Sequence, residues 1–291
     1  MNRLSNEQRI RVLAALVDGA SVRATCRMTG AAKGTVLKLL AEVGTACAEY
    51  QRRVMVNLPC QRLEADEIWS FVGAKQANTE PKLRGLGTRG DVWTWTVICA
   101  DTKLMPCFLV GPRNADAAMM FMADVASRMA GRVQLTTDGL KWYLPAVESA
   151  FGWNGVDYAM LVKQYGAAPD HGPARRYSPA VVTAAIREPI MGNPDERKIS
   201  TSYAERANLS IRMNQRRFTR LTNGFSKNVE NHTHSLSLWF MYYNFCRSHQ
   251  TLTRDKKGIH TTPAMAAGLT DHAWALAEIL ALVAATAKAA A

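Results

Sequence analysis

Residues 63–72 read Leu-Glu-Ala-Asp-Glu-Ile-Trp-Ser-Phe-Val, and this short run already indicates the class of fold. Its aliphatic and aromatic side chains are typical of a β-strand that enters a hydrophobic core. Asp66 and Glu67 interrupt the pattern, and charged groups in such a strand are costly unless something such as a metal ion compensates them. The run therefore predicts a strand that carries a functional carboxylate.

The rest of the central region predicts an α/β fold. Residues 92–99 form a second strand-like run, and the turn Asp101-Thr102-Lys103 joins it to residues 104–110 as a hairpin. A helix is expected at 114–129, and further strands at 132–137 and 158–163. Three successive strands followed by helix, strand and more helices predict a mixed sheet with helices on both faces.

The amino-terminal region predicts three helices between residues 5 and 54. Ser5 and Gln8 have the spacing of a capping box, Ser21 can cap a short second helix, and a third helix begins near Lys33. A short helix, a turn and a longer helix form a helix-turn-helix, which we assign to residues 1–57 as a DNA-binding domain. A plain three-helix bundle or a dimerisation module is the alternative interpretation.

In a helix-turn-helix, the first residues of the second element enter the major groove of DNA. The residues at that place are Ala32, Lys33, Gly34, Thr35 and Lys38. Arg23 and Arg27, on the preceding helix, are expected to reach phosphates.

The net charge of +12 is confined to two segments. Residues 1–60 hold nine basic and four acidic side chains, residues 200–260 hold ten basic and three acidic, and the remainder is neutral. A protein that grips a polyanion in two places would show this distribution. We therefore expect double-stranded DNA as the partner, while basic solvated helix faces are the alternative explanation.

The later segments complete a domain over residues 61–255 and a helical tail over 256–291. Five prolines fall between residues 164 and 199, so we expect a proline-rich insertion with little regular structure, in which 180–186 leaves room for a short strand or helix. Long helices are expected at 200–218 and 228–246, and an alanine-rich helix at 271–291.

Composition argues against a secreted or membrane protein. The chain starts without the apolar region of a secretory signal, and its longest uncharged apolar stretch, 279–287, is too short to cross a bilayer. Six cysteines without a C-x-x-C pair favour reduced thiols. We expect a soluble cytoplasmic protein that does not associate with membranes.

Three carboxylates stand at chemically informative places. Asp66 lies within the first strand, Asp138 follows the strand at 132–137, and Glu205 lies on the helix that starts near residue 200. Carboxylates so placed can converge on two magnesium ions about 3.5–4 Å apart, which suits in-line displacement at a phosphodiester.

Each of these carboxylates has an alternative interpretation. Glu67 instead of Asp66 could be the ligand, because adjacent residues of a strand face opposite ways. Asp138 could simply begin a turn with the glycine that follows it. Glu205 could close a capping box that begins at Ser202.

Four motifs resemble a known family, the transposases of the insertion-sequence-one group. These motifs are D-E-I-W-S-F-V at 66–72, T-D-G at 137–139, E-R-x-N-L-x-x-R at 205–212 and R-L-T-N-G-F-S-K-N-V-E-N-H at 220–232. The resemblance covers nearly the whole chain. The family's enzymes are bacterial DDE transposases, and their catalytic core has an RNase H-like fold.

The resemblance implies that Asp66, Asp138 and Glu205 are the catalytic, metal-binding triad for two Mg²⁺ ions, with Mn²⁺ able to substitute. Arg212 matches the basic residue seven positions after the family's glutamate. Glu230 is a rival third acid, but its seventh successor is Ser237, so Glu205 is preferred. Two departures are the missing amino-terminal zinc finger and a longer interval between Asp138 and Glu205.

The implied function is DNA transposition by strand cleavage and strand transfer, carried out by a homodimer or higher oligomer on DNA. Besides the helix-turn-helix, the residues expected to hold the DNA backbone are Arg212, Arg216, Arg217, Arg220 and Lys227. Two rival functions are a DNA-binding regulator with an inactive RNase H-like domain and a nuclease of the same fold that mobilises no DNA.

Overall fold

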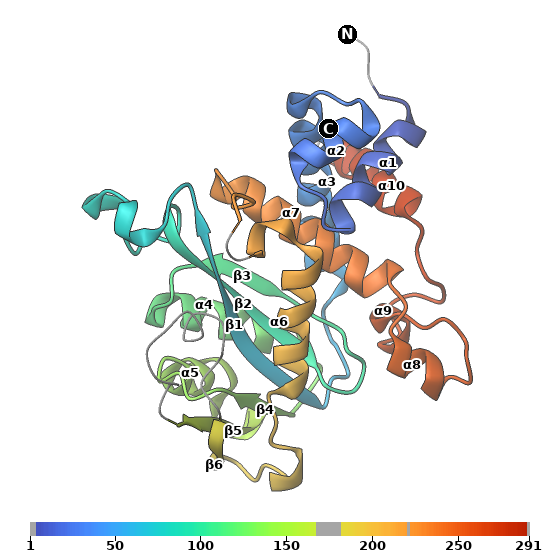
Figure 1. Cartoon of the computed structure of the whole chain (residues 1–291). Helices are drawn as coiled ribbons and strands as arrows, with labels where there is room; N and C mark the ends of the chain where they lie inside the picture. Colours follow the sequence, from blue (N-terminus) through green and yellow to red (C-terminus); the bar gives the residue numbers. More distant parts are fainter. Residues whose placement is uncertain (1–3, 167–181, 220–221, 290–291) are drawn as a thin grey trace.

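A six-stranded mixed sheet forms the centre of the molecule, with the strand order β3-β2-β1-β4-β5-β6 (Figure 1). The computed structural model describes residues 4–166, 182–219 and 222–289. The strands are β1 (Arg62–Val72), β2 (Gly90–Cys99), β3 (Phe108–Gly111), β4 (Val133–Thr137), β5 (Val156–Tyr165) and β6 (Val182–Met191). β1 is antiparallel to β2 and parallel to β4, so the predicted α/β class with a mixed sheet is confirmed.

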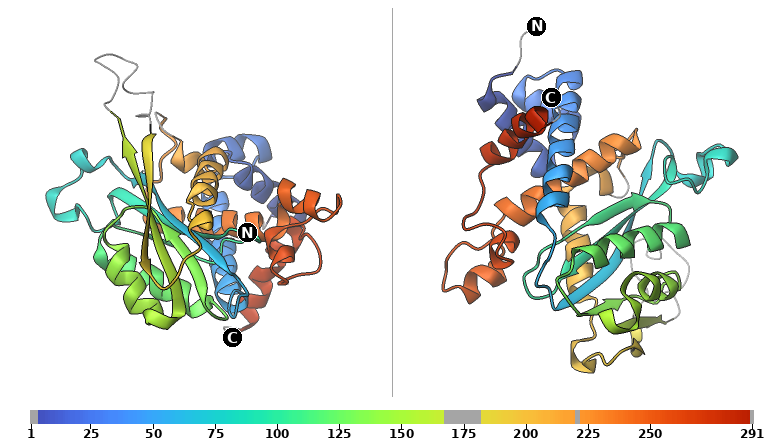
Figure 2. Two further views of the ribbon diagram at one scale, coloured as in Figure 1. Left: turned by 90° about the horizontal axis from the view of Figure 1, so that it is seen from below. Right: turned by 180° about the vertical axis from the view of Figure 1, so that it is seen from behind.

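Helices cover both faces of this sheet, as predicted (Figure 2). The helices are α1 (Asn6–Val17), α2 (Val22–Thr29), α3 (Lys33–Val54), α4 (Ala115–Arg128), α5 (Tyr143–Gly155), α6 (Ser202–Asn214), α7 (Val229–Met241), α8 (Gln250–Asp255), α9 (Pro263–Ala266) and α10 (Leu276–Ala289). α4 and α5 lie on one face, where Trp95, Phe121 and Tyr143 are fully buried. α6 and α7 lie on the other, where Ile68 packs with Ile211 and Phe240.

Alternation along β1 determines which helices its side chains meet. Glu64 and Asp66 face α6, because their carboxylates accept hydrogen bonds from that helix. Glu67 faces the other way and accepts a hydrogen bond from Tyr143 on α5. One strand therefore presents carboxylates to both layers of helices.

The three amino-terminal helices form where the sequence predicts them. The capping box of α1 is present: Gln8 N donates to Ser5 Oγ at 3.2 Å, and Ser5 N donates to Gln8 Oε1 at 2.9 Å. α2 is capped by Ser21 and ends at Gly30, whose φ of 72° is the left-handed conformation that glycine adopts at little cost. Apolar residues of α3, including Val36 and Leu40, are buried.

These helices pack tightly against the central region. Gly44 of α3 lies so close to α7 that an added Cβ would come within 2.5 Å of the Cβ of His234. Gln51 of α3 donates to the carbonyl of Ser237 on α7 at 3.2 Å. α10, from the other end of the sequence, packs on α1 and α3 beside them (Figure 1). A single hydrophobic cluster runs through both regions.

Three expectations about secondary structure need correction. The segment 164–199 was expected to have little regular structure, with room for a short strand or helix at 180–186, but residues 182–191 form β6, a full strand that pairs antiparallel with β5. The hairpin partner expected at 104–110 is reduced to the short β3, which starts only at Phe108. The helix expected at 200–218 ends at Asn214. Within the described residues, no helix combines the length and the hydropathy needed to cross a membrane.

Candidate metal centre and nucleic-acid interface

The acidic cavity is a cleft of about 990 Å³ that Asp66, Asp138 and Glu205 line together. The sheet explains why the first two meet. β1 and β4 are parallel, with Ala65 opposite Thr137, so the next residues are Asp66 in β1 and Asp138 just beyond the end of β4. α6 packs on the face formed by β1 and β2 and brings Glu205 to the cavity.

Three carboxylates come close enough to share a cation. Asp66, Glu67 and Asp138 each offer a carboxylate oxygen, and these oxygens all lie within 4.8 Å of one another. Asp66 and Glu67, which the sequence presented as alternatives, therefore belong to one group. Oxygen donors of this kind suit a hard divalent cation.

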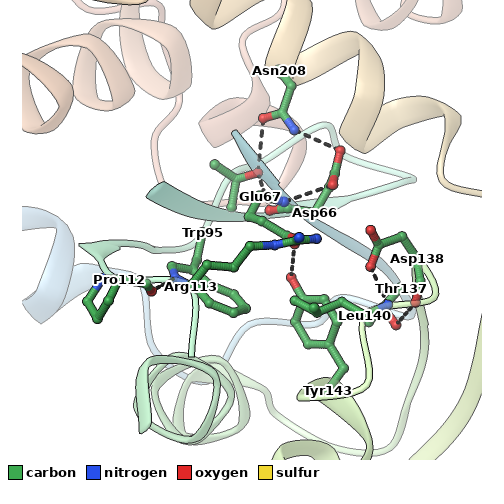
Figure 3. A network of polar contacts seen from close by, with 11 residues as sticks. Asp66, Glu67, Trp95, Pro112, Arg113, Thr137, Asp138, Leu140, Tyr143 and Asn208 are labelled. Carbon is green, nitrogen blue, oxygen red and sulfur yellow. Dashed lines mark hydrogen bonds and ion pairs between the residues drawn. The ribbon is translucent and has the colours of Figure 1, made fainter. Parts of the chain in front are cut away.

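Asp66 is held by hydrogen bonds from two directions (Figure 3). Its Oδ1 accepts from the backbone N of Glu67 at 2.8 Å, and its Oδ2 accepts from Nδ2 of Asn208 on α6 at 2.8 Å. Oγ1 of Thr96, in the neighbouring strand, lies 3.2 Å from Oδ1 of Asn208 and orients its amide. Asn208 was part of a recognised motif, but the sequence analysis gave it no role.

Glu67 is the most enclosed member of the group, with 1% of its side chain exposed. Its Oε1 accepts from Nε of Arg113 at 2.7 Å, and its Oε2 accepts from the hydroxyl of Tyr143 at 3.1 Å. Arg113 also stacks over the Trp93 ring, 4.7 Å from its centroid. Neither Arg113 nor Tyr143 was singled out in the sequence, because their approach to Glu67 depends on tertiary packing.

Burial and mutual repulsion raise the pKa values of these acids. Burial, followed by the charge of Asp138, raises the pKa of Asp66 to about 6. The same two causes raise the pKa of Glu67 to about 7, against the opposing effect of Arg113. Burial also raises the pKa of Asp138. A divalent cation would offset this repulsion, so the chemistry of these residues fits a metal site.

Asp138 does begin a turn, as the alternative interpretation stated. Its Oδ1 accepts from the backbone N of Leu140 at 3.0 Å. The same carboxylate nevertheless belongs to the group with Asp66 and Glu67. The turn thus positions the carboxylate.

Glu205 lines the cavity but stands apart from the three grouped acids, with 47% of its side chain exposed. It forms an ion pair with Lys163 of β5 and accepts from the hydroxyl of Thr201 at 2.6 Å. The capping box from Ser202 is wrong, because α6 already includes Ser202. Glu230 lies at the start of α7 and lines a different cavity.

Glu64 takes the place of the missing cap on α6. Its Oε2 accepts from the backbone N of Tyr203 at 2.7 Å and from that of Ala204 at 3.1 Å. A carboxylate at a helix start also interacts favourably with the helix dipole. Glu64 therefore ties the helix that carries Glu205 to the strand that carries Asp66. Glu64 lies two residues before Asp66, so the two side chains face the same side of the strand. This spacing was the signal in the sequence for the role of Glu64.

The predicted DNA-binding residues lie in different parts of the molecule. Lys33, Thr35 and Lys38 are exposed in the first turns of α3, and Arg23 and Arg27 are exposed on α2. Arg212 lines the acidic cavity. Arg220 lies outside the described residues.

A second cleft, the basic pocket, gathers five of the cations. It has a volume of about 440 Å³ and lies between the starts of α2 and α3 and the connection from α6 to α7. Its cationic lining residues are Arg23, Lys33, Arg216, Arg217 and Lys227. The two basic segments of the sequence therefore meet in one place.

Comparison with models of known protein families and with curated proteins finds no match to this chain.

Proposed function

We propose that the protein is a DNA transposase with an RNase H-like catalytic core, which cuts one strand at a DNA end and joins the new 3′-hydroxyl to target DNA. The observation that carries the proposal is the acidic cavity. It combines Asp66 within β1 and Asp138 just beyond the end of the parallel strand β4 with Glu205 on α6, which packs on β1 and β2. The motif resemblance names these same three residues.

The donor set supports Mg²⁺ as the cofactor, with Mn²⁺ as a substitute. The grouped oxygens come from carboxylates whose pKa values are raised by burial and mutual repulsion, and such acids gain most from a nearby cation. Two ions bound there would activate the attacking oxygen and stabilise the leaving oxygen of the phosphodiester.

The surrounding residues have separate tasks in this proposal. Asn208 and the backbone of Glu67 fix the orientation of the Asp66 carboxylate. Glu64 fixes the start of α6 and thereby the place of Glu205. Lys163 forms an ion pair with Glu205, so we expect Glu205 to leave this pair when it binds a cation.

The amino-terminal helices supply the DNA-binding part of the proposal as a helix-turn-helix. Lys33, Thr35 and Lys38 are exposed at the start of α3, where a recognition helix presents its base-reading residues. Arg27 is exposed on α2 and would contact phosphate.

A strand-cleavage and strand-joining assay tests this function. The substrate is a duplex that carries the terminal inverted repeat flanking the gene, with Mg²⁺ or Mn²⁺ added. The parental protein should nick and join this duplex, and Asp138→Asn should do neither. Glu148→Gln, which removes an exposed carboxylate of α5 outside the cavity, is the matched control and should remain active.

Each outcome of this assay has a clear reading. If Asp138→Asn cuts and joins at the parental rate, the proposed catalytic site is wrong. If the parental protein binds the duplex but never cuts it with either metal, the protein is a DNA-binding regulator. Cutting without joining would indicate a nuclease.

A further inference from the structure

The basic pocket is a concentrated positive site that is separate from the acidic cavity. It lies at the junction of regions distant in sequence: the starts of α2 and α3 form one side, and residues within 215–217 and 223–228 form the other. None of the described residues that line it is acidic. Its volume of about 440 Å³ is in the range of pockets that hold a ligand group.

Within the described residues, none of the cations of the pocket forms an ion pair with a carboxylate. Arg217 is partly buried, and its Nη1 donates to Oγ of Ser226 at 3.0 Å. In the described part of the chain, no carboxylate lies within 4 Å of its guanidinium, and burial lowers its pKa to about 10. The pKa of Lys227 is also lowered, first by lost hydration and then by the charge of Arg23. Like charges gathered in this way indicate that an anion belongs between them.

Helix starts add to the positive potential. α3, which has 22 residues, begins at Lys33, and its cap residue Ala32 makes no side-chain hydrogen bond to the first turn. α2 and α7 also begin at the pocket, where Ser21 and Asn228 are lining residues. Helix amino termini carry partial positive charge and unpaired backbone N–H groups, which favour phosphate.

Close packing fixes the two sides of the pocket relative to each other. Gly19, which follows α1, lies where an added Cβ would come within 3.0 Å of the carbonyl oxygen of Asn214, the last residue of α6. Gly44 meets α7 at His234, and Gln51 bonds the backbone of the same helix. The separation of the two backbone regions that carry the cations is therefore set by these contacts.

We propose that the basic pocket binds one backbone phosphate of the DNA, with Arg23 contacting it from the amino-terminal helices and Lys227 from the α6–α7 connection. Its identification with DNA rests on the proposed function. One phosphate would then be held jointly by the DNA-binding helices and by the region that carries the acidic cavity. Because both sides are packed rigidly, the distance from this phosphate to the cleavage position is constant.

The first test measures how DNA affinity depends on salt, using full-length protein with Asp138→Asn and a duplex of arbitrary sequence. Each phosphate contact contributes a slope of about 0.9 in log affinity against log salt. The double variant Arg23→Gln/Lys227→Gln should lower the slope by about one, because its two cations share one phosphate. A fall of about two would mean two separate phosphates, and no fall would mean no contact. Either result overturns the proposal.

The controls for this test come from the same chain. Lys256→Gln removes an exposed cation of the same basic segment that does not line the pocket, and it should leave the slope above that of the double variant. Arg23 and Lys227 are exposed, so we expect the melting temperature to stay at the parental value. If the double variant melts early, the single variants Arg23→Gln and Lys227→Gln, both at exposed residues, are used in its place.

The second test neutralises single phosphates with methylphosphonate along a duplex that carries the terminal inverted repeat. One position should weaken binding by the Asp138→Asn protein and have little effect on the double variant in the same background. Arg23→Gln and Lys227→Gln should each lose sensitivity at that same position. Loss of sensitivity at two different positions would overturn the shared contact.

Two further outcomes distinguish DNA phosphate from a free anion as the ligand, and the failure of this inference from the failure of the proposed function. If the double variant binds DNA normally but is no longer stabilised by inorganic phosphate, the pocket serves a free anion and the proposal is overturned. A protein that never cuts DNA would contradict the proposed function alone, because both binding tests use the Asp138→Asn background.

Discussion

The acidic cavity and the basic pocket both concentrate charge of one sign, but they are built from different kinds of element. The acids stand on strands and at a strand end, and short hydrogen bonds from Asn208, Arg113 and the backbone fix them. The cations are mostly exposed side chains at helix starts and in a connection between helices. The carboxylates of the cavity therefore have fixed positions, whereas the cations of the pocket are less constrained and have neighbours of the same charge.

This difference predicts different responses to substitution. A fixed carboxylate has no substitute nearby, so its loss should abolish an activity. A long cation has neighbours of the same charge, so its loss should weaken binding by degrees. The following predictions are ordered from the largest expected effect to the smallest.

Asp66→Asn should abolish strand cleavage while leaving DNA binding intact. The amide keeps the shape of the side chain but removes the charge that holds a cation, and we expect a rate loss on the order of 10⁴-fold. Cleavage rates and equilibrium DNA binding are measured on the same duplex, with Glu148→Gln as the control. A variant that loses binding together with cleavage would show that the two sites are not separable in this way.

Metal affinity should fall steeply as pH decreases, because the grouped acids must lose their protons to bind a cation. With the pKa of Asp66 at about 6 and that of Glu67 at about 7, we expect a loss on the order of 100-fold between about pH 8 and about pH 5.5. Calorimetric titration with Mn²⁺ measures this. An affinity that does not change over this range would contradict the raised pKa values.

The same pKa values predict the opposite pH dependence for the metal-free protein. The folded state binds more protons than the unfolded state between the ordinary carboxyl pKa and the raised ones. The contribution of these acids to folding stability therefore decreases as pH rises through that window. Saturating Mg²⁺ should remove this decrease, which thermal unfolding at several pH values would reveal.

Arg113→Met should destabilise the protein by about 2 kcal/mol at about pH 8, because it leaves the buried Glu67 carboxylate without its cation. The loss should be smaller at about pH 5.5, where Glu67 is protonated. Denaturant unfolding measures both values. The double variant Arg113→Met/Glu67→Gln should recover part of the loss, and an equal loss in both backgrounds would contradict the pairing.

Glu64→Gln should have the smallest effect, a loss of about 1 kcal/mol in folding stability, because the amide oxygen can still accept from the start of α6. Cleavage should slow slightly while DNA affinity stays the same, since only the position of Glu205 is disturbed. Glu64→Ala removes the acceptor altogether and should slow cleavage further. Equal cleavage by both variants would show that Glu64 does not position α6.

Much of the fold was accessible from local patterns in the sequence. Capping residues located the amino-terminal helices, and aromatic and branched runs located β1 and β2. β6 was missed because prolines in the flanking segment suggested irregular structure, whereas the strand contains a proline, Pro189, at the edge of the sheet. Edge strands tolerate proline, since one side of their backbone pairs with no neighbour.

Only those residues of the candidate site that belong to a short sequence pattern could be predicted from the sequence. Asp66 and Asp138 could be found because each lies in or directly after a strand-like run, and Glu205 through the recognised motif. The residues that support them are distant in sequence: Asn208 meets Asp66 across 142 positions, and Tyr143 meets Glu67 across 76. Such contacts follow from helix packing on the sheet, which no sequence period encodes. The meeting of both basic segments in one pocket depends on the same packing.

The packing of α10 on α1 and α3 has a consequence for synthesis of the chain. The amino-terminal helices leave the ribosome first, but the helix that covers part of their apolar surface is made last among the described elements. Until Ile279 and Leu280 emerge and become buried, that surface has no cover. The amino-terminal helices therefore complete their packing late, after the sheet region beside them has already been translated.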